Sequence, residues 1–425
     1  MDVIKVEGGY KLHGSVRVEG AKNSALKLMA ATIMAPGVYH LGNVPNISDV
    51  RLMAKVLETL GASVVHEDHA LVIDTTNASE WVTPYELVSK MRASISILGP
   101  LITRFGKAVV AMPGGCNIGA RSIDQHLAGL ASLGVNFSNE HGNIHADASR
   151  GLTGTIVTLD FPSVGATENV MMGAVKAQGI TIIENAAREP EIVDLACMLN
   201  AMGADIRDAG SHVIEIHGVE TLHACDHVTV GDRIEAGTFL VAGALCADEG
   251  LTVTGFDPMH LDIPLSKMAL MGIPVTRHAD GVTVCKAKHL LPADVQTLPF
   301  PGFPTDMQAQ FMVLDTMADG ASFVTENVFE NRFMLVAELV RMGANIRVEE
   351  RHALIKGPCK LTGAQVAAPD LRGGAALVLA GLVAEGTTYV SETRHIKRGY
   401  ERFAEKLCSI GAQVSHIEVA DPDEI

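Results

Sequence analysis

The segment LVRMGANIRVEERHALIKG, residues 339–357, contains the pattern that decides the fold. An amphipathic helix ends at its glycine, Gly343, and the alternating apolar and polar residues that follow predict a β-hairpin. Five further glycines stand in the same apolar–glycine–small context: Gly61, Gly134, Gly203, Gly272 and Gly411. Because the six glycines recur at intervals of 68 to 73 residues, the sequence predicts six copies of one structural unit.

A second helix precedes the glycine in every copy and is apolar on nearly all sides, which is typical of a buried helix. The six segments are SALKLMAATIMAPG (24–37), ASISILGPLITRFG (93–106), ATENVMMGAVKAQG (166–179), AGTFLVAGALCADEG (236–250), DMQAQFMVLDTMADG (306–320) and GGAALVLAGLVAEG (373–386). A short β run follows each of them, for example LTVTGF at 251–256. Each copy is therefore an α/β unit of the βαβαββ type, with two helices and about four strands.

The chain ends predict how the six copies are grouped. The sixth copy stops after AQVSHIEV (412–419), and its missing strands are similar to the N-terminal IKVEGGYKLHG (4–14). We therefore expect two similar domains of three repeats each. One domain comprises residues 22–229, and the other comprises residues 1–21 and 230–425.

Composition excludes several classes of protein. Of the 425 residues, 48% are hydrophobic and 19% are charged, so the chain can bury large cores and is not disordered. A net charge of −16 argues against nucleic-acid and anionic-membrane partners. The seven cysteines form no CxxC pair, the N-terminus has no signal-peptide core, and the apolar stretches are too interrupted to span a membrane. We expect a cytoplasmic protein with no obligate protein partner.

Polar residues open all six buried helices at equivalent places in the repeats. They are Lys22, Arg92, Ser163, Asp232, Asp306 and Arg372. Helix N-termini attract anions, so three such starts in each domain, facing three in the other, would form an anion-binding cleft. The alternative is that these residues are ordinary helix caps. The clusters 370–372 and 395–398 also have a simpler interpretation, as surface ion pairs.

The segment MPGGCNIGAR, residues 112–121, predicts a reactive cysteine. Cys116 lies in a glycine-rich loop shortly before an expected helix start at Ser122 and five residues before Arg121. The nearby helix start and the positive charge of Arg121 both favour the thiolate form of Cys116. The alternative is a small hydrophobic residue in a turn. His126 and His395 lack metal-ligand spacing, and no dinucleotide or Walker motif is present, so we expect neither a metal nor a cofactor.

Ten motifs together carry a family resemblance that covers essentially the whole chain. They are AKNSAL (21–26), MRAS (91–94), PGGCNIGAR (113–121), SVGATEN (163–169), ENAAREPEIVDL (184–195), DRIEAGTF (232–239), FPTDMQAQF (303–311), ENVFENRFM (326–334), DLRGGAALVLAG (370–381) and HIKRGYER (395–402). The chain resembles the UDP-N-acetylglucosamine enolpyruvyl transferases. The resemblance implies two inverted α/β barrel domains, each with three units around buried helices. It also implies a reaction in which phosphoenolpyruvate and UDP-N-acetylglucosamine are the substrates, in peptidoglycan precursor synthesis.

The resemblance also implies roles for individual residues. Those matching the catalytic residues are Cys116, Asp306, Lys22 and Arg398, and Cys116 matches the residue alkylated by fosfomycin. Those matching the phosphoenolpyruvate site are Lys22, Asn23, Arg121, Arg372 and Arg398. Those matching the nucleotide-sugar site are Arg92, Arg121, Ser122, Ile123, Asp124, Gln125, Ser163, Val164, Gly165, Asp306 and Val328. Asp306 would take the proton of the sugar hydroxyl.

Three positions depart from the family pattern. Phe161 lies where some members carry a lysine, Ser122 replaces a common proline, and Lys397 replaces a common aspartate. Two alternative functions stay open. One is 5-enolpyruvylshikimate-3-phosphate synthase, which lacks the cysteine loop, and the other is a non-catalytic protein that binds a UDP-sugar.

Overall fold

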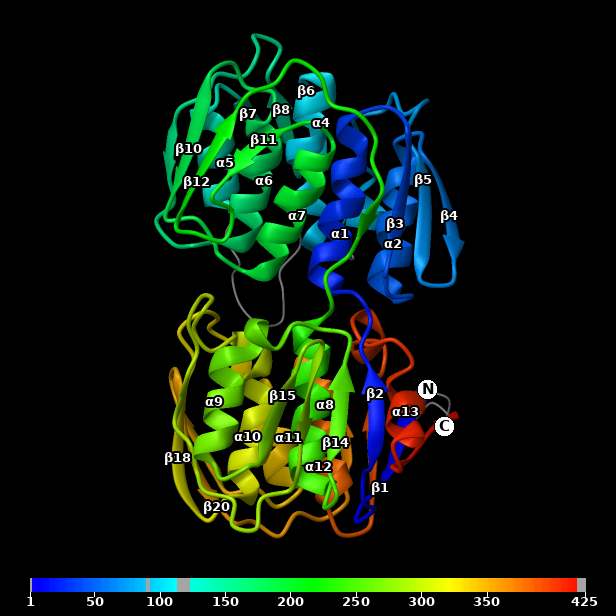
Figure 1. The fold of residues 1–425 in the computed structure, drawn as a ribbon, viewed down its shortest axis with the longest axis vertical. Helices are drawn as coiled ribbons and strands as arrows, with labels where there is room; N and C mark the ends of the chain where they lie inside the picture. The colour runs from blue at the N-terminus through cyan, green and yellow to red at the C-terminus, as the bar shows by residue number, and fades with distance from the viewer. Residues whose placement is uncertain (1, 89–91, 113–122, 419–425) are drawn as a thin grey trace. The chain divides into compact units, whose positions relative to one another are not determined.

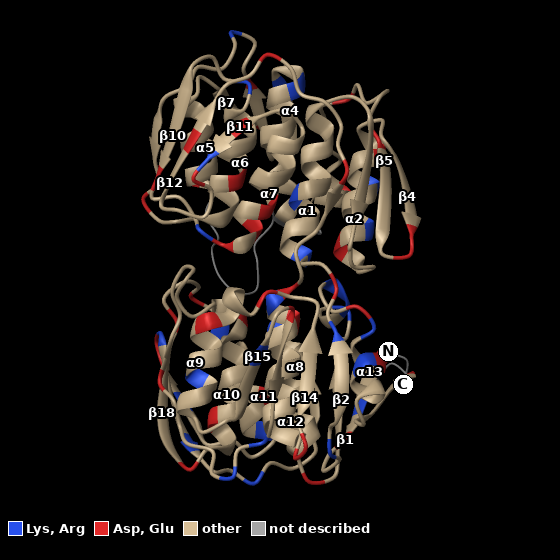
Figure 2. Ribbon diagram, in the orientation of Figure 1, with Lys and Arg blue, Asp and Glu red and all other residues tan. Residues whose placement is uncertain are grey.

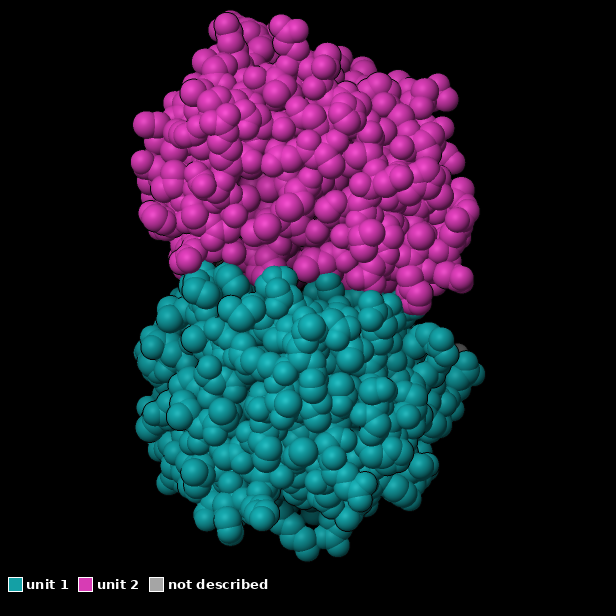
Figure 3. Space-filling model, viewed as in Figure 1, with its two compact units in different colours: residues 1–19, 117–120, 231–425 teal, residues 20–116, 121–230 magenta. Residues whose placement is uncertain are grey.

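The computed structural model describes residues 2–88, 92–112 and 123–418, and its elements are labelled in Figure 1. The chain forms two compact units, which Figure 3 colours separately. Unit 1 holds the described residues up to Glu19 and from Gly231 onward, and unit 2 holds the described residues from Gly20 to Val230. Over the described residues, the chain therefore passes between the units twice, near residues 20 and 230.

The strands of unit 2 form three separate sheets, with orders β13-β3-β5-β4, β6-β8-β7 and β11-β12-β10-β9. The strands are β3 (Val38–Gly42), β4 (Ser63–Glu67), β5 (Ala70–Asp74), β6 (Lys107–Ala111), β7 (Asn136–Glu140), β8 (Asn143–Asp147), β9 (Ile156–Thr158), β10 (Ile180–Glu184), β11 (Asp205–Arg207), β12 (Val213–His217) and β13 (His227–Val228). In each sheet a hairpin pairs antiparallel with the strand that follows a buried helix. In two of the sheets, that strand also pairs in parallel with a short edge strand. In the sheet β6-β8-β7, the parallel pairing is reduced to a single bridge between Val82 and Val109.

Unit 1 repeats this plan in three more sheets, with orders β15-β16-β14-β2, β17-β18-β20-β19 and β21-β22-β1-β23. The strands are β1 (Asp2–Glu7), β2 (Gly14–Arg17), β14 (Leu251–Thr254), β15 (Val275–His278), β16 (Gly281–Val284), β17 (Val295–Gln296), β18 (Gly320–Thr325), β19 (Ile346–Glu349), β20 (His352–Gly357), β21 (Gln365–Ala367), β22 (Thr387–Ser391) and β23 (Gln413–Glu418). The predicted α/β class and six-fold repeat are confirmed. The described strands form six separate sheets.

Two edge strands lie just before the points where the chain passes between the units, and each pairs within its own unit. Strand β2 directly precedes the first helix of unit 2, yet it pairs in parallel with β14 of unit 1. Strand β13 directly precedes the first long helix of unit 1 after the second crossing, yet it pairs in parallel with β3 of unit 2. The N-terminal strand β1 pairs with both β22 and β23, at the position that a hairpin strand occupies in the other sheets.

Three helical segments form the centre of each unit. They are α1 (Lys22–Ala31), η2 (Arg92–Ile97) with α4 (Leu98–Phe105), and α6 (Val164–Ala174) in unit 2, and α8 (Arg233–Cys246), η4 (Thr305–Met307) with α10 (Gln308–Met317), and α12 (Leu371–Val383) in unit 1. In α8 and α12 the charged residues are confined to the first turn, and the rest of each ribbon is uncharged in Figure 2. Each fully buried Leu or Val side chain stabilises the fold by about 1.5–3 kcal/mol. The helices are therefore the core of each unit, as predicted.

Six outer helices end at the repeated glycines. They are α2 (Ser48–Thr59), α5 (Asp124–Ser132), α7 (Pro190–Ala201), α9 (Asp262–Leu270), α11 (Leu335–Arg341) and α13 (Phe403–Ser409). All six glycines have φ between 83° and 105°. The N–H after each glycine donates to a carbonyl in the last helical turn, as from Ala344 to Leu339 at 3.0 Å. This ending requires left-handed backbone, which confirms the predicted helix ends.

The remaining helical segments are short. They are α3 (Tyr85–Val88), η1 (Thr32–Met34), η3 (Pro258–Leu261), η5 (Arg332–Met334) and η6 (Ile396–Arg398). Two of them, η5 and η6, carry arginines, and Arg332 of η5 contacts Asp306 at the start of α10.

Candidate active site

The starts of α10 and α12 in unit 1 bring Asp306 beside two arginines. Arg372 Nε lies 3.1 Å from Asp306 Oδ2, and an Nη atom of Arg332 contacts Asp306 Oδ1. The guanidinium groups are buried, with only 3% of the Arg372 side chain and 5% of the Arg332 side chain exposed. Asp306 retains 24% exposure. Its carboxylate is thus fixed on both oxygens by positive charge and still accessible to a ligand.

Asp370 organises the same cluster from the N-cap of α12. One of its oxygens accepts hydrogen bonds from the N–H groups of Arg372 and Gly373, at 2.8 and 3.0 Å. The same oxygen lies 3.8 Å from Arg332 Nη1. A carboxylate at this place both caps the helix and shares a cation with Asp306. The interpretation of residues 370–372 as a surface ion pair is wrong, because Arg372 is buried.

Arg372 stays positively charged and keeps free hydrogen-bonding capacity. Burial alone would lower its pKa, but Tyr400, whose ring centroid is 5.3 Å away, and Asp306 outweigh burial and raise the pKa above its ordinary value. Among the described residues, Arg372 Nη1 and Arg332 Nε are buried without a hydrogen-bond partner. Buried donors are seldom left unpaired, so this end of the cluster suits an anionic ligand.

Glu326 fixes the backbone around Val328 and η4. Its Oε1 accepts from the N–H groups of Val328 and Phe329, at 2.8 and 3.1 Å, and its Oε2 accepts from the Thr305 hydroxyl at 2.9 Å. Since Thr305 adjoins Asp306, one buried carboxylate holds both the Val328 turn and the start of η4. Val328 is half-buried at this turn.

In unit 2, the start of α1 places Lys22 in a nearly buried ion pair. Lys22 Nζ lies 2.8 Å from Asp49 Oδ2, and Asp49 lies in the first turn of α2. The next residue, Asn23, is exposed. The arrangement fixes one cation at a helix start and leaves an amide side chain accessible beside it.

The starts of α5 and α6 also lie together in unit 2. Gln125 Oε1 accepts from the Phe161 N–H at 3.3 Å, and the Ser163 hydroxyl caps α6 by accepting from the Ala166 N–H. Gly165 faces His126 so closely that an added Cβ would lie 2.8 Å from the imidazole Cε1. Asp124 is exposed, and Ile123 and Val164 are half-buried. The Gln125 and Ser163–Gly165 parts of the predicted nucleotide-sugar site are therefore neighbours.

Several predicted residues are described only in part or not at all. Cys116, Arg121 and Ser122 lie outside the described residues, and Arg92 is described only as the first residue of η2. Arg398 ends η6 and is half-buried. Lys397 forms an exposed ion pair with Asp2 at 2.7 Å, so the surface interpretation holds for this residue.

Sequence reasoning missed Arg332, Glu326 and Asp49. The first two stand in the quoted motif ENVFENRFM, where a charged residue without periodic spacing gives no sign of burial. Asp49 occupies the first turn of an outer helix, where an acidic residue has the simpler role of favouring the helix dipole. A search for charged residues within the predicted motifs could have found Glu326 and Arg332, but Asp49 lies 23 residues after the end of the nearest motif, AKNSAL.

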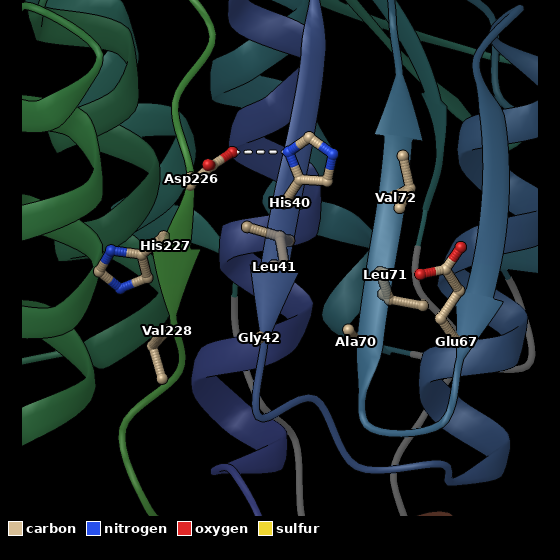
Figure 4. Close-up of a pocket in the computed structure, with 10 residues that line it drawn as sticks. All are labelled: His40, Leu41, Gly42, Glu67, Ala70, Leu71, Val72, Asp226, His227 and Val228. Carbon is tan, nitrogen blue, oxygen red and sulfur yellow. Dashed lines mark hydrogen bonds and ion pairs between the residues drawn. The ribbon is translucent and has the colours of Figure 1, made fainter.

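A hollow of about 480 Å³ lies elsewhere, on the outer face of the sheet β13-β3-β5-β4 (Figure 4). The small residues Gly42 and Ala70 line it, and His40 Nδ1 and Asp226 Oδ1 lie 2.7 Å apart at its edge. It contains none of the predicted site residues, so the candidate site is the set of helix starts. Within the described ranges, no group of three metal-ligating side chains is found, and no helix could cross a membrane.

Comparisons with known proteins first define the class. Residues 6–407 match the family model of EPSP synthase (3-phosphoshikimate 1-carboxyvinyltransferase). The enolpyruvyl transferase NikO from Streptomyces tendae superposes with a TM-score of 0.88 at 27% identity, over 98% of both chains. EPSP synthase from Acinetobacter baumannii superposes with a TM-score of 0.77 over 98% of this chain and 100% of its own, and at 16% identity it shows the fold alone.

Two curated relatives are more similar in sequence to this chain than these solved structures are. The chain is 50% identical, over 98% of its length, to the UDP-N-acetylglucosamine 1-carboxyvinyltransferases 1 of Staphylococcus aureus (strain N315) and Halalkalibacterium halodurans. It covers 100% and 95% of those proteins. The chain therefore belongs to the EPSP synthase family of enolpyruvyl (1-carboxyvinyl) transferases, and it is a transferase.

Proposed function

We propose that this protein transfers the enolpyruvyl group of phosphoenolpyruvate to the 3-hydroxyl of UDP-N-acetylglucosamine, with release of phosphate. The observation that carries the proposal is 50% identity over 98% of the chain to enzymes named for that acceptor. The Asp306 cluster supports it, because a carboxylate suits a hydroxyl proton and unpaired guanidinium N–H groups suit an anion. The reaction would be the first committed step of peptidoglycan precursor synthesis, and would thereby serve cell-wall growth, cell shape and division.

The proposed chemistry is addition followed by elimination. In the addition, the sugar O3 bonds to C2 of phosphoenolpyruvate, Asp306 accepts the hydroxyl proton, and C3 gains a proton to become a methyl group. In the elimination, the methyl group loses a proton, the double bond re-forms, and the C2–O bond to phosphate breaks. The intermediate carries phosphate and carboxylate on one carbon, so fixed cations stabilise it. We assign that task to Lys22, Arg121, Arg372 and Arg398, with Asn23 beside them.

The remaining assignments concern Cys116 and the nucleotide sugar. Cys116 would protonate C3 or hold phosphoenolpyruvate covalently, and its thiolate would be the group that fosfomycin alkylates. The nucleotide sugar would lie along Arg92, Arg121–Gln125, Ser163–Gly165 and Val328. Phe161 provides no cation there. Its side chain is exposed, and its backbone N–H donates a hydrogen bond to Gln125 Oε1. We place the protein in the cytoplasm, which the six described free cysteines support.

Phosphate release with two acceptors tests the proposal. Purified protein is incubated with phosphoenolpyruvate and either UDP-N-acetylglucosamine or shikimate 3-phosphate. We expect phosphate only with the nucleotide sugar. Release with shikimate 3-phosphate alone would favour EPSP synthase, and binding of the nucleotide sugar without release would favour a non-catalytic protein. Either result would overturn the proposal.

A further inference from the structure

Tyr400 follows η6 and contributes a buried side chain to the core of unit 1. Only 2% of the residue is exposed. Its N–H donates to the Ile396 carbonyl at 3.0 Å, in the turn that carries Arg398. Its ring packs against Phe403, with the two centroids 4.8 Å apart. The backbone of Tyr400 and one contact of its ring are therefore fixed by neighbouring residues of the same unit.

The Tyr400 hydroxyl joins a polar network between two buried helices. It lies 2.9 Å from the Thr238 hydroxyl on α8. Gln310 Nε2 on α10 donates to the same Thr238 oxygen at 3.0 Å and more weakly to Tyr400 at 3.5 Å. Thr238 gives its own proton to the Ile234 carbonyl at 2.9 Å. Tyr400 is therefore the donor in its bond with Thr238, and its hydroxyl is tied to α8.

The ring of Tyr400 lies beside Arg372. The guanidinium carbon is 5.3 Å from the ring centroid, within the range of a cation–π contact. Arg372 Nε lies 3.1 Å from Asp306 Oδ2, and Arg372 Nη1 is buried without a partner among the described residues. Because a guanidinium held only through Nε can rotate about its Nε–Cζ bond, the ring contact is what fixes the direction of Nη1.

We infer that Tyr400 is a positioning residue for Arg372. Its hydroxyl, bonded to Thr238, holds the ring against the guanidinium, so that Nη1 stays available to an anionic group while Nε stays on Asp306. The inference rests on the proposed function in one respect, because the anion would be the phosphoenolpyruvate that we assign to Arg372. Nothing in this role requires Tyr400 to touch a substrate.

Removal of the Tyr400 hydroxyl tests the inference. Tyr400→Phe keeps the ring and its packing against Phe403 but loses the bond to Thr238. We expect kcat/KM for phosphoenolpyruvate to fall by about five-fold or more, the loss expected from one hydrogen bond, and KM for UDP-N-acetylglucosamine to change by less than about two-fold. Thr238→Val removes the same bond from the other side, so the double variant should be no worse than Thr238→Val alone.

The matched controls are Tyr39→Phe and Thr316→Val. Tyr39 is buried in unit 2, and its hydroxyl donates to a backbone carbonyl at 2.9 Å. Thr316 is buried on α10 and donates to the carbonyl four residues earlier at 2.8 Å, as Thr238 does on α8. Both controls should leave kcat/KM for phosphoenolpyruvate within about two-fold of wild type. If either control lowers it as much as Tyr400→Phe does, or if Tyr400→Phe raises KM equally for both substrates, the residue is only structural and the inference is overturned.

A measurement that does not depend on turnover separates this inference from the proposed function. In protein labelled with ¹⁵N-arginine, the Arg372 side-chain signals are those lost in Arg372→Lys. Rotation about the Nε–Cζ bond exchanges the two Nη groups, and it should be about five-fold or more faster in Tyr400→Phe than in wild type or Tyr39→Phe. Equal rates in Tyr400→Phe and wild type overturn the inference even if wild type is active. A faster rate with no phosphate release by wild type supports the positioning contact while the proposed function fails.

Discussion

The two units share one repeated framework but carry different chemistry at the starts of their buried helices. In unit 1, Asp306 and Arg372 pair at 3.1 Å, and Arg372 Nη1 is left unpaired beside them within the described residues. In unit 2, Lys22 pairs with Asp49 at 2.8 Å, and the Ser163 hydroxyl caps α6. The comparison teaches that equivalent positions in a repeat can carry different groups: unit 1 has a carboxylate held by arginines, and unit 2 has a paired lysine and a capped helix start. Under the proposed function, these groups would be a proton acceptor and a cation.

Asp306→Asn should have the largest effect, because it removes the proton acceptor that distinguishes unit 1. The amide keeps the shape of the carboxylate but cannot take the hydroxyl proton, so kcat should fall by about 10²–10⁴. The measurement is steady-state phosphate release, with circular dichroism to confirm the fold.

Asp262→Asn is the control for this change. Asp262 lies on α9 in the same unit, and its side chain is 50% exposed in an ion pair with Arg277. Its substitution should leave kcat within about two-fold, as expected of a surface residue. If Asp306→Asn keeps more than about a tenth of wild-type kcat, the proton acceptor lies elsewhere.

Two buried ion pairs extend the comparison to stability. In unit 2, Lys27 Nζ lies 2.6 Å from Glu168, and in unit 1, Lys406 Nζ lies 2.8 Å from Glu235. Burial raises the pKa of each glutamate to about 7 in spite of its lysine. A raised pKa means that the folded protein binds more protons than the unfolded chain between about pH 4.5 and pH 7. The stability contribution of each group is therefore lost as pH rises through that window.

Glu168→Gln should remove this pH dependence from unit 2. The unfolding free energy of wild type should fall by about 1–3 kcal/mol more than that of the variant between pH 5 and pH 7. The single tryptophan, Trp81, lies in unit 2, so its fluorescence during urea unfolding reports on that unit. Glu235→Gln in unit 1 is the control and should leave the Trp81 transition with the wild-type slope. Equal slopes in wild type and Glu168→Gln would contradict the pKa assignment.

Gly165→Ala should have the smallest effect of the three. The new Cβ would meet the His126 ring at 2.8 Å and push it aside, which costs about 1 kcal/mol and raises KM for UDP-N-acetylglucosamine about five-fold. Gly42→Ala in the same unit is the control, since its Cβ would meet Val228 at an ordinary 3.5 Å. Identical KM values for the two variants would count against a role for the α6 start in sugar binding.

The features that the sequence predicts well are those fixed by local backbone requirements. The six glycines mark helix ends because φ near 100° is costly for other residues, and the apolar helices are buried because they have no polar face. The partners of β2 and β13 were not predicted, because strand partners are chosen by tertiary packing. Arg332 was missed for a related reason: its partner Asp306 is 26 residues away and shares no local pattern with it.

The central claim is enolpyruvyl transfer by addition and elimination, and a reaction in D2O tests it most directly. Addition would place a deuteron on C3 of phosphoenolpyruvate, and elimination would then remove one of the three hydrogens of the transient methyl group. We predict deuterium in the vinyl methylene of the enolpyruvyl product formed from UDP-N-acetylglucosamine, detected by mass spectrometry and NMR. A product that carries the enolpyruvyl group but no deuterium would contradict this account, because C3 would never have been protonated.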